Sequence, residues 1–135
     1  SNRKITKERM ESVEQKVCLD TDIVIALLNN EERAGDFADN IAQSTVFITA
    51  ITLFELLLRK TNIQAIETFR DKVYVLDFDE DSARKASILF KELQSKGRIT
   101  DIRDIYIASI CLINRCSLAT FNKKHFESVD GLTLI

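Results

Sequence analysis

The sequence contains no proline, no tryptophan and only three glycines, so it is poor in residues that interrupt helices or form tight turns. We therefore expect short loops and a chain rich in helices. A large excess of either charge is also absent, because the formal net charge is −2. This excludes a uniformly basic surface for nucleic acids, and a polyanionic partner would need a local basic patch or a bridging cation.

Long apolar runs and an even number of cysteines are missing too. No run approaches the roughly 18 residues of a membrane span, and no signal peptide is recognisable, so we expect a cytoplasmic protein without a membrane partner. Cys18, Cys111 and Cys116 lack the spacing of a metal site and are expected to be reduced, buried thiols. A disulfide between Cys111 and Cys116 is the alternative.

Short apolar segments alternate with amphipathic ones along a chain of 135 residues, long enough for one domain with a substantial core. The segments expected to be strands are 16–19, 45–49, 73–78, 117–120 and 132–135. The segments with helical patterns are 22–30, 31–44, 51–60, 62–71, 79–97 and 100–115. Strands without polar alternation that take turns with helices are typical of a parallel sheet covered on both faces. We predict an α/β protein with a five-stranded parallel sheet in a three-layer α/β/α arrangement over residues 16–135.

The N-terminal segment differs from the rest of the chain. Residues 1–15 are highly charged and have only sparse apolar positions, so we expect a helical extension that docks weakly or frays. Ser1 and Asn2 resemble the remnant of a purification tag.

Polar residues follow several of the expected strands, at the sheet edge where open parallel sheets bind ligands. Asp20 and Asp22 follow the first strand, and Asn122 follows the fourth. Glu55 lies in the helix after the second strand, among apolar residues. An unpaired carboxylate buried there would cost several kcal/mol, so Glu55 needs a cation or an opening to solvent.

Asp101 and Asp104 start the helix before the fourth strand and share one helix face. Each acid has a local alternative role. Asp20 or Asp22 can cap a helix, Asp101 with Asp104 fits a capping box, and Asn122 fits a turn.

Acids that converge from separate segments repel one another unless protons or a metal ion neutralise them. Because neither histidine nor cysteine is among them, Mg²⁺ or Mn²⁺ fits best. A carboxylate cage around such an ion with open water positions is suited to phosphodiester cleavage.

These stretches resemble the PIN domain family and, within it, the VapC-like toxin ribonucleases. The matches are LDTD (19–22), ITAITLFELL around Glu55, SKGRITDIRDIYIAS around Asp104 and ATFNKKHF (119–126). They have the family's order and spacing and cover residues 16–135. The resemblance implies a five-stranded parallel sheet between helices and an Mg²⁺- or Mn²⁺-dependent endoribonuclease. It also implies a homodimer and a small VapB-like antitoxin that inserts a peptide at the acidic pocket.

The family's site residues carry over by position. Asp20, Glu55 and Asp104 match the core acids and would hold the metal ion. Asn122 occupies the place where many members have a fourth Asp, and its neutral amide adds no charge for a second ion. The matches to polar positions around the pocket are Asp22, Thr49, Thr120 and, most loosely, Asp101.

The expected mechanism is attack of a water, activated by the ion, on a backbone phosphorus of RNA. The family pattern implies products with a 3′-hydroxyl and a 5′-phosphate. The basic residues near the motifs, expected to bind RNA, are Arg59, Lys60, Arg98, Arg103, Lys123 and Lys124. We expect His125, in the turn after the fourth strand, to pack or form hydrogen bonds rather than act as a general base.

Other interpretations stay open. The chain could be a housekeeping RNA-processing nuclease or a binding module with a PIN fold and no catalysis. A receiver-like phosphoacceptor is disfavoured because the sequence has no room for the lysine that follows a fifth strand in that class.

Phe121 and Phe126 are expected to pack in the core, with base stacking as the alternative. The apolar helix positions that suit either the core or a dimer or antitoxin groove are Phe37, Ile41, Leu53, Phe54 and Leu57.

Overall fold

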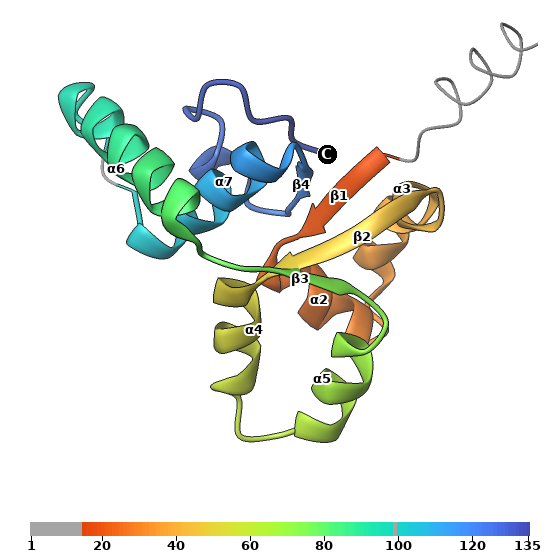
Figure 1. Ribbon diagram of the computed structural model, residues 1–135. Coiled ribbons are helices and arrows are strands. Elements are labelled where there is room, and N and C mark those ends of the chain that lie inside the picture. The colour runs from red at the N-terminus through yellow and green to blue at the C-terminus, as the bar shows by residue number, and fades with distance from the viewer. Residues whose placement is uncertain (1–14, 99) are drawn as a thin grey trace, which may run out of the picture.

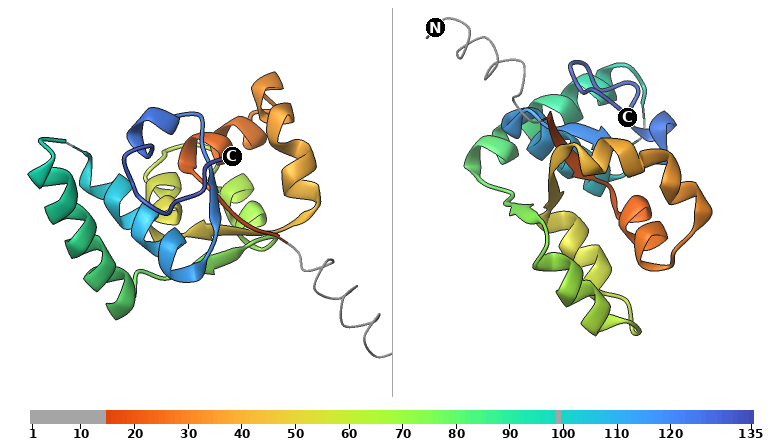
Figure 2. Two further views of the ribbon diagram at one scale, coloured as in Figure 1. Left: turned by 90° about the horizontal axis from the view of Figure 1, so that it is seen from above. Right: turned by 90° about the vertical axis from the view of Figure 1, so that its right-hand side faces the viewer.

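A parallel β-sheet lies between two layers of helices in the computed structural model, which describes residues 15–98 and 100–135 (Figures 1 and 2). The strands are β1 (Gln15–Leu19), β2 (Ser44–Thr49), β3 (Tyr74–Leu76) and β4 (Ser117–Ala119). The sheet order is β3-β2-β1-β4, and all three strand pairs are parallel. Apart from Gln15, the predicted N-terminal extension lies outside the described residues.

Helices and short turns connect these strands. The α-helices are α2 (Thr21–Leu28), α3 (Ala38–Ala42), α4 (Ala50–Leu57), α5 (Ile63–Arg70), α6 (Glu80–Ser95) and α7 (Ile102–Asn114). The 3-10 helices are η1 (Glu32–Phe37) and η2 (Lys123–His125). The longest of the described helices, α6, has 16 residues, and none of them combines the length and the hydropathy needed to cross a membrane.

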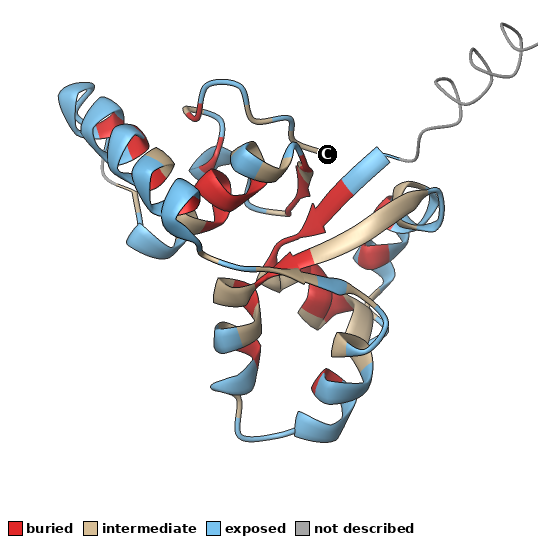
Figure 3. Ribbon diagram, in the orientation of Figure 1, coloured by how far each residue is buried: buried red, intermediate tan, exposed pale blue. Residues whose placement is uncertain are grey.

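The central strand β1 is buried on both faces, as its unbroken apolar sequence predicts. Cys18 packs against residues of α6 and α7, whereas Val17 and Leu19 pack with residues of α2, α4 and α5. All three side chains are buried, and Figure 3 shows buried residues along the middle of the sheet and on the inward sides of the helices. The two hydrophobic clusters therefore account for the predicted three-layer arrangement.

The fifth strand predicted over residues 132–135 is wrong. This segment meets the sheet only at an isolated parallel bridge between Leu118 and Leu134. The Leu118 N–H donates to the Thr133 carbonyl and the Ile135 N–H donates to the Leu118 carbonyl, both at 2.9 Å. Because β4 has only three residues, it offers little backbone for a longer ladder, and the described sheet has four strands.

One predicted helix is also wrong. Residues 31–44 form η1 and the short α3 instead of a continuous α-helix, and Ser44 already belongs to β2. Gly35 and the short polar side chains of this segment have low helix propensity, which favours a broken path. Phe37 nevertheless anchors the junction, because its side chain is buried against the cluster under α2.

The other helices agree with the predicted ranges except at their ends. The predicted helix 51–60 begins at Ala50 and ends at Leu57, so Arg59 and Lys60 lie beyond its last turn. Gly97 has a φ of 69° directly after the C-cap of α6, which is the left-handed conformation expected for a terminating glycine. The three cysteines are free and buried, as predicted, so Cys111 and Cys116 form no disulfide.

Candidate functional site

Asp20 occupies the centre of the acidic site, at the point where β1 ends and α2 begins. Only 7% of this residue is exposed. The carboxylate accepts hydrogen bonds from the Thr120 hydroxyl at 2.7 Å and from the Thr21 N–H at 2.9 Å. The backbone N–H of Asp20 donates to the Ala119 carbonyl at 2.9 Å. The pairing of β1 with β4 thus brings together residues that are 100 positions apart.

Asp22 lies in the first turn of α2 and also contacts the chain after β4. One carboxylate oxygen, Oδ2, accepts from the Phe121 N–H at 3.1 Å. The other, Oδ1, is buried and has no hydrogen-bond partner in the part of the chain that the structure describes. A buried oxygen without a partner is costly, so this atom suits a cation or a donating ligand.

Glu55 extends from α4 toward α2 and α7. One oxygen accepts from the Thr21 hydroxyl at 3.1 Å, and the other lies 3.5 Å from a guanidinium nitrogen of Arg103. The Glu55 side chain is 22% exposed. Glu55 therefore has both the cationic partner and the opening that its apolar sequence context requires.

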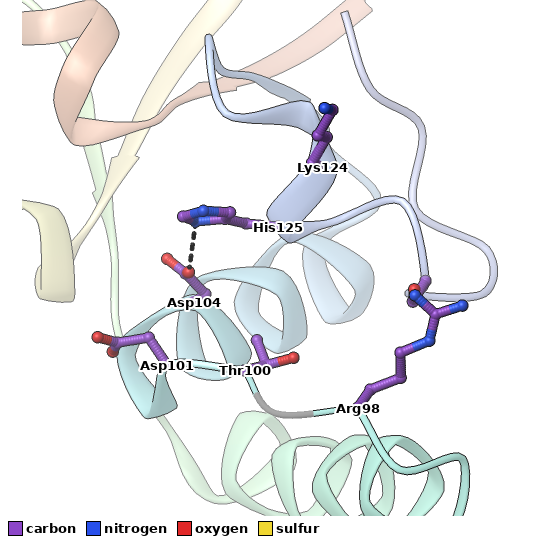
Figure 4. Close-up of a pocket in the computed structure, with 7 residues that line it drawn as sticks. Arg98, Thr100, Asp101, Asp104, Lys124 and His125 are labelled. Atoms are coloured by element: carbon purple, nitrogen blue, oxygen red, sulfur yellow. Dashed lines mark ion pairs between the residues drawn. The ribbon is translucent and has the colours of Figure 1, made fainter.

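The acids of α7 have different roles from each other. Asp101 caps the helix, because its Oδ1 accepts from the Arg103 N–H at 2.8 Å, and this bond lowers the pKa of Asp101. Asp104 instead lies with its Oδ2 3.3 Å from Nδ1 of His125, and its side chain is 20% exposed (Figure 4). The capping alternative is correct for Asp101, whereas Asp104 faces η2.

The pKa values of the clustered acids are raised. Burial raises the pKa of Asp20 from 3.8 to about 6, although the hydrogen bond from Thr120 opposes the shift. Burial also raises the pKa of Asp22, Glu55 and Asp104. The negative charge of Asp104 contributes to the raised pKa of both Asp20 and Glu55, so the three predicted metal ligands lie within electrostatic reach of one another.

A cavity of about 240 Å³ opens beside Asp104, between η2 and the α6–α7 connection (Figure 4). We name it the Arg98–Lys124 cavity. Its lining residues are Arg98, Thr100, Asp101, Asp104, Lys124, His125 and Ser128. The acidic site and the cavity thus share Asp104.

The carboxylates of the clustered acids fit a hard divalent cation, because they offer only oxygen atoms as ligands. One of these oxygens, Asp22 Oδ1, has no hydrogen-bond partner within the described residues. Within residues 15–98 and 100–135, however, no group of three acidic, histidine or cysteine side chains is already arranged to hold an ion. Each predicted ligand has a protein partner instead, in the pairs Asp20–Thr120, Glu55–Arg103 and Asp104–His125. Binding an ion would require these side chains to exchange such contacts.

The family model of the PIN domain matches residues 17–132. The chain belongs to the PIN domain family. This confirms the resemblance seen in the sequence and excludes the receiver-like interpretation.

Relatives and solved structures agree with this membership. Ribonuclease VapC1 of Methanocaldococcus jannaschii is 29% identical over 130 residues, covering 95% of this chain and 91% of the relative. The tRNA(fMet)-specific endonuclease VapC of Shigella flexneri is 30% identical over 124 residues, covering 87% of this chain and 94% of the relative. The structure of VapBC-1 from nontypeable Haemophilus influenzae superimposes with a TM-score of 0.79 at 26% identity, covering 90% of this chain and 97% of the other.

Of the other polar residues predicted for the candidate site, Thr49 and Thr120 have side-chain hydrogen bonds and Asn122 has none in the described part of the chain. Thr49 is buried and caps α4, because its hydroxyl accepts from the Thr52 N–H at 3.0 Å. Thr120 is buried and accepts from the Asn122 N–H at 3.0 Å. The Asn122 side chain is exposed and forms no hydrogen bond within the described residues.

The basic residues predicted to bind RNA separate into groups. Arg98 and Lys124 line the named cavity, and Lys123 is exposed in the same turn, η2. Arg103 already contacts Glu55 and Asp101. The two basic residues after α4, Arg59 and Lys60, have a different setting: Arg59 lines a separate cavity with the end of α2 and the start of α5, and Lys60 is exposed.

Two side chains that contribute to the candidate site, Thr21 and Thr52, were not predicted from the sequence. Thr21 contacts both Glu55 and, at 3.2 Å, the Thr52 hydroxyl, so it joins α2 to α4. Its signal was its place between the two acids of LDTD. His125 was expected to form hydrogen bonds, but its partner could not be named from the sequence.

The phenylalanines on either side of η2 pack as expected. Phe126 is buried in the cluster under α6 and α7. Phe121 contacts Phe37 edge to face at 5.3 Å, and the Arg33 guanidinium lies 4.1 Å from the centre of its ring. Base stacking on Phe121 would have to displace Arg33.

Replacing Thr120 with valine should destabilise this PIN domain by about 1–3 kcal/mol, because Asp20 and the Asn122 N–H both lose a buried partner. Thr120→Ser, which retains the hydroxyl, should lose much less. Urea unfolding of the two variants beside the wild type measures the difference. Equal losses would mean that the methyl group, not the hydroxyl, matters.

Proposed function

We propose that this PIN domain is a VapC-type toxin, an endoribonuclease that hydrolyses RNA phosphodiester bonds with Mg²⁺ or Mn²⁺. The proximity of Asp20, Glu55 and Asp104 carries this proposal, because the charge of Asp104 contributes to the raised pKa of both Asp20 and Glu55. Relatives named as VapC ribonucleases support it.

Asp20, Glu55 and Asp104 would hold the ion, directly or through its waters. When bound, the ion would lower the pKa of a water molecule and neutralise negative charge on the phosphate. Asp22 offers its unpartnered oxygen and Asn122 an exposed amide, and both would orient water molecules. Thr49, Thr120 and Asp101 would act indirectly, because they fix α4, Asp20 and α7. The products would carry a 3′-hydroxyl and a 5′-phosphate.

We also propose a small VapB-like antitoxin as partner and a homodimer as the assembly. The solved neighbours include VapBC complexes, such as DNA-bound VapBC from Salmonella typhimurium. On this chain, Phe54 and Leu58 of the α4 region are 54% and 60% exposed, and Leu57 beside them is also exposed. An apolar surface next to Glu55 suits a partner that covers the acidic site. The free cysteines suit action in the cytoplasm.

The nuclease activity is tested by incubating the protein with structured RNAs in Mg²⁺, in Mn²⁺ and in EDTA. We expect cleavage with either ion and none in EDTA. The Asp104→Asn variant should lose about 100-fold or more in cleavage rate, because the amide cannot supply the negative charge. Its melting temperature should change little, since Asp104 does not cap α7.

The matched control is Asp71→Asn, which removes an exposed carboxylate after α5 and should cleave like the wild type. A fully active Asp104→Asn variant would remove Asp104 from the mechanism. Absence of cleavage by the wild type with any ion would favour the PIN-fold binding module. Cleavage without any antitoxin gene nearby would favour a housekeeping RNA-processing nuclease.

A further inference from the structure

Two cations in the Arg98–Lys124 cavity have no partner of their own. Arg98 lies in the connection between α6 and α7, and Lys124 lies in η2, so separate segments supply them (Figure 4). Both residues are exposed. In the part of the chain that the structure describes, neither the Arg98 guanidinium nor the Lys124 ammonium forms a hydrogen bond or an ion pair. Both groups are therefore available to a ligand.

The acids that line the same cavity are already engaged. Asp101 accepts from the Arg103 N–H at 2.8 Å and lies 3.4 Å from its Nε. Asp104 is paired with His125. Unlike the acids, the two cations have no partner among the described residues, so they are the charged groups of this lining that are free to bind a ligand. A ligand that pairs with them is an anion.

Hydroxyl groups complete the lining. Thr100 and Ser128 border the cavity, and each can donate a hydrogen bond to an oxygen anion. A phosphate group, which has several acceptor oxygens, matches a guanidinium, an ammonium and two hydroxyls better than a carboxylate does. The volume of about 240 Å³ leaves room for a phosphate with part of a neighbouring sugar.

We propose that the Arg98–Lys124 cavity binds the RNA phosphate adjacent to the phosphate that is cleaved. This inference rests on the proposed nuclease function, because the shared Asp104 places the cavity directly beside the acidic site. A strand whose cleaved phosphate lies at Asp20 and Asp104 has its neighbouring phosphate within the cavity. Arg98 and Lys124 then fix the register of the RNA and favour strands that continue on this side.

Binding is measured in an Asp20→Asn background, so that RNA stays intact, with fluorescein-labelled oligouridylate as the probe. Arg98→Gln with Lys124→Gln should weaken affinity about tenfold at low salt. The slope of log affinity against log salt should fall by about 0.7, the value for one lost phosphate contact on a single strand. The matched control, Arg70→Gln with Lys72→Gln, removes the same charges at the last residue of α5 and just after it, and should change affinity less than about twofold.

The position of the phosphate is tested with RNA oligonucleotides that span the bond cleaved by the wild type. In each, one phosphate next to the cleaved bond is replaced by an uncharged methylphosphonate. Replacement of the phosphate that lies in the cavity should weaken binding about tenfold with Arg98 and Lys124 present and have no effect when both are glutamine. An equal loss in both proteins would overturn the proposal.

The outcomes separate this inference from the nuclease proposal. If the glutamine variants bind oligouridylate like the control, the cavity does not hold RNA, although cleavage by the wild type would still support the nuclease. If those variants instead lose affinity for polyglutamate alone, the cavity is an acidic-peptide site and the RNA assignment is wrong. If the wild type cleaves no RNA, the nuclease proposal fails, while the oligouridylate titration still decides whether the cavity binds phosphate.

Discussion

Replacing Asp20 with asparagine should abolish RNA cleavage and at the same time stabilise the metal-free protein. The loss of cleavage should be about 100-fold or more, because the central carboxylate of the site disappears. The gain in stability follows from burial, which raises the pKa of Asp20 from 3.8 to about 6. At neutral pH the folded protein must hold a buried negative charge that asparagine does not carry.

The direction of the pKa shift decides how the stability of the folded protein depends on pH. Because the pKa of Asp20 is higher in the folded than in the unfolded protein, its contribution to stability is greatest below pH 3.8 and is lost as the pH rises through about 6. At pH 7.5 the loss approaches about 3 kcal/mol. We expect Asp20→Asn to exceed the wild type by about 1–3 kcal/mol there, and the two proteins to converge near pH 4.

Urea unfolding in EDTA at both pH values measures these free energies. The control Asp71→Asn, which removes an exposed carboxylate, should match the wild type at each pH. An Asp20→Asn variant that is less stable than the wild type at pH 7.5 would show that the hydrogen bonds of the carboxylate outweigh the cost of burying it.

Replacing Phe126 with alanine should cost about 3–5 kcal/mol of unfolding free energy, a large part of the typical 5–15 kcal/mol of a domain. The ring is only 1% exposed and belongs to the cluster under α6 and α7. It directly follows η2, so its loss should also loosen Lys124 and His125. Urea unfolding measures the cost, with Phe90→Ala as the control.

Phe90 is 43% exposed on α6 and should contribute much less. Similar losses in the two alanine variants would contradict the deep burial of Phe126. If Phe126→Ala retains wild-type RNA affinity despite the lost stability, η2 does not depend on this ring for its conformation.

The order of strands and helices could be predicted because each strand has its own apolar signature. Val17, Cys18 and Leu19 are buried on alternate faces of β1, so an unbroken apolar run identifies the central strand. Residues 132–135 have a similar run but no ladder. Strand formation there depends on how much of β4 is available, and that length is decided by the tertiary structure rather than by the segment itself.

The sequence pointed to the candidate acids by their places near strand ends and at the start of a helix, but it did not reveal the partners of their side chains. The contact of Glu55 with Arg103 depends on how α4 and α7 are rotated about their axes, which no local pattern reports. The sequence also did not predict which apolar side chains of α4 are exposed. Phe54 and Leu56 are both apolar, yet only Leu56 lies in the core.

The contacts between the LDTD stretch and the chain after β4 have a consequence for biosynthesis. Asp20 with Thr120, and Asp22 with Phe121, join positions 100 and 99 residues apart. Contacts of such high sequence separation form late, after the intervening loop has closed. A nascent chain on the ribosome therefore cannot form these two contacts until residue 121 has left the exit tunnel, and a translation product that ends before Thr120 lacks both of them.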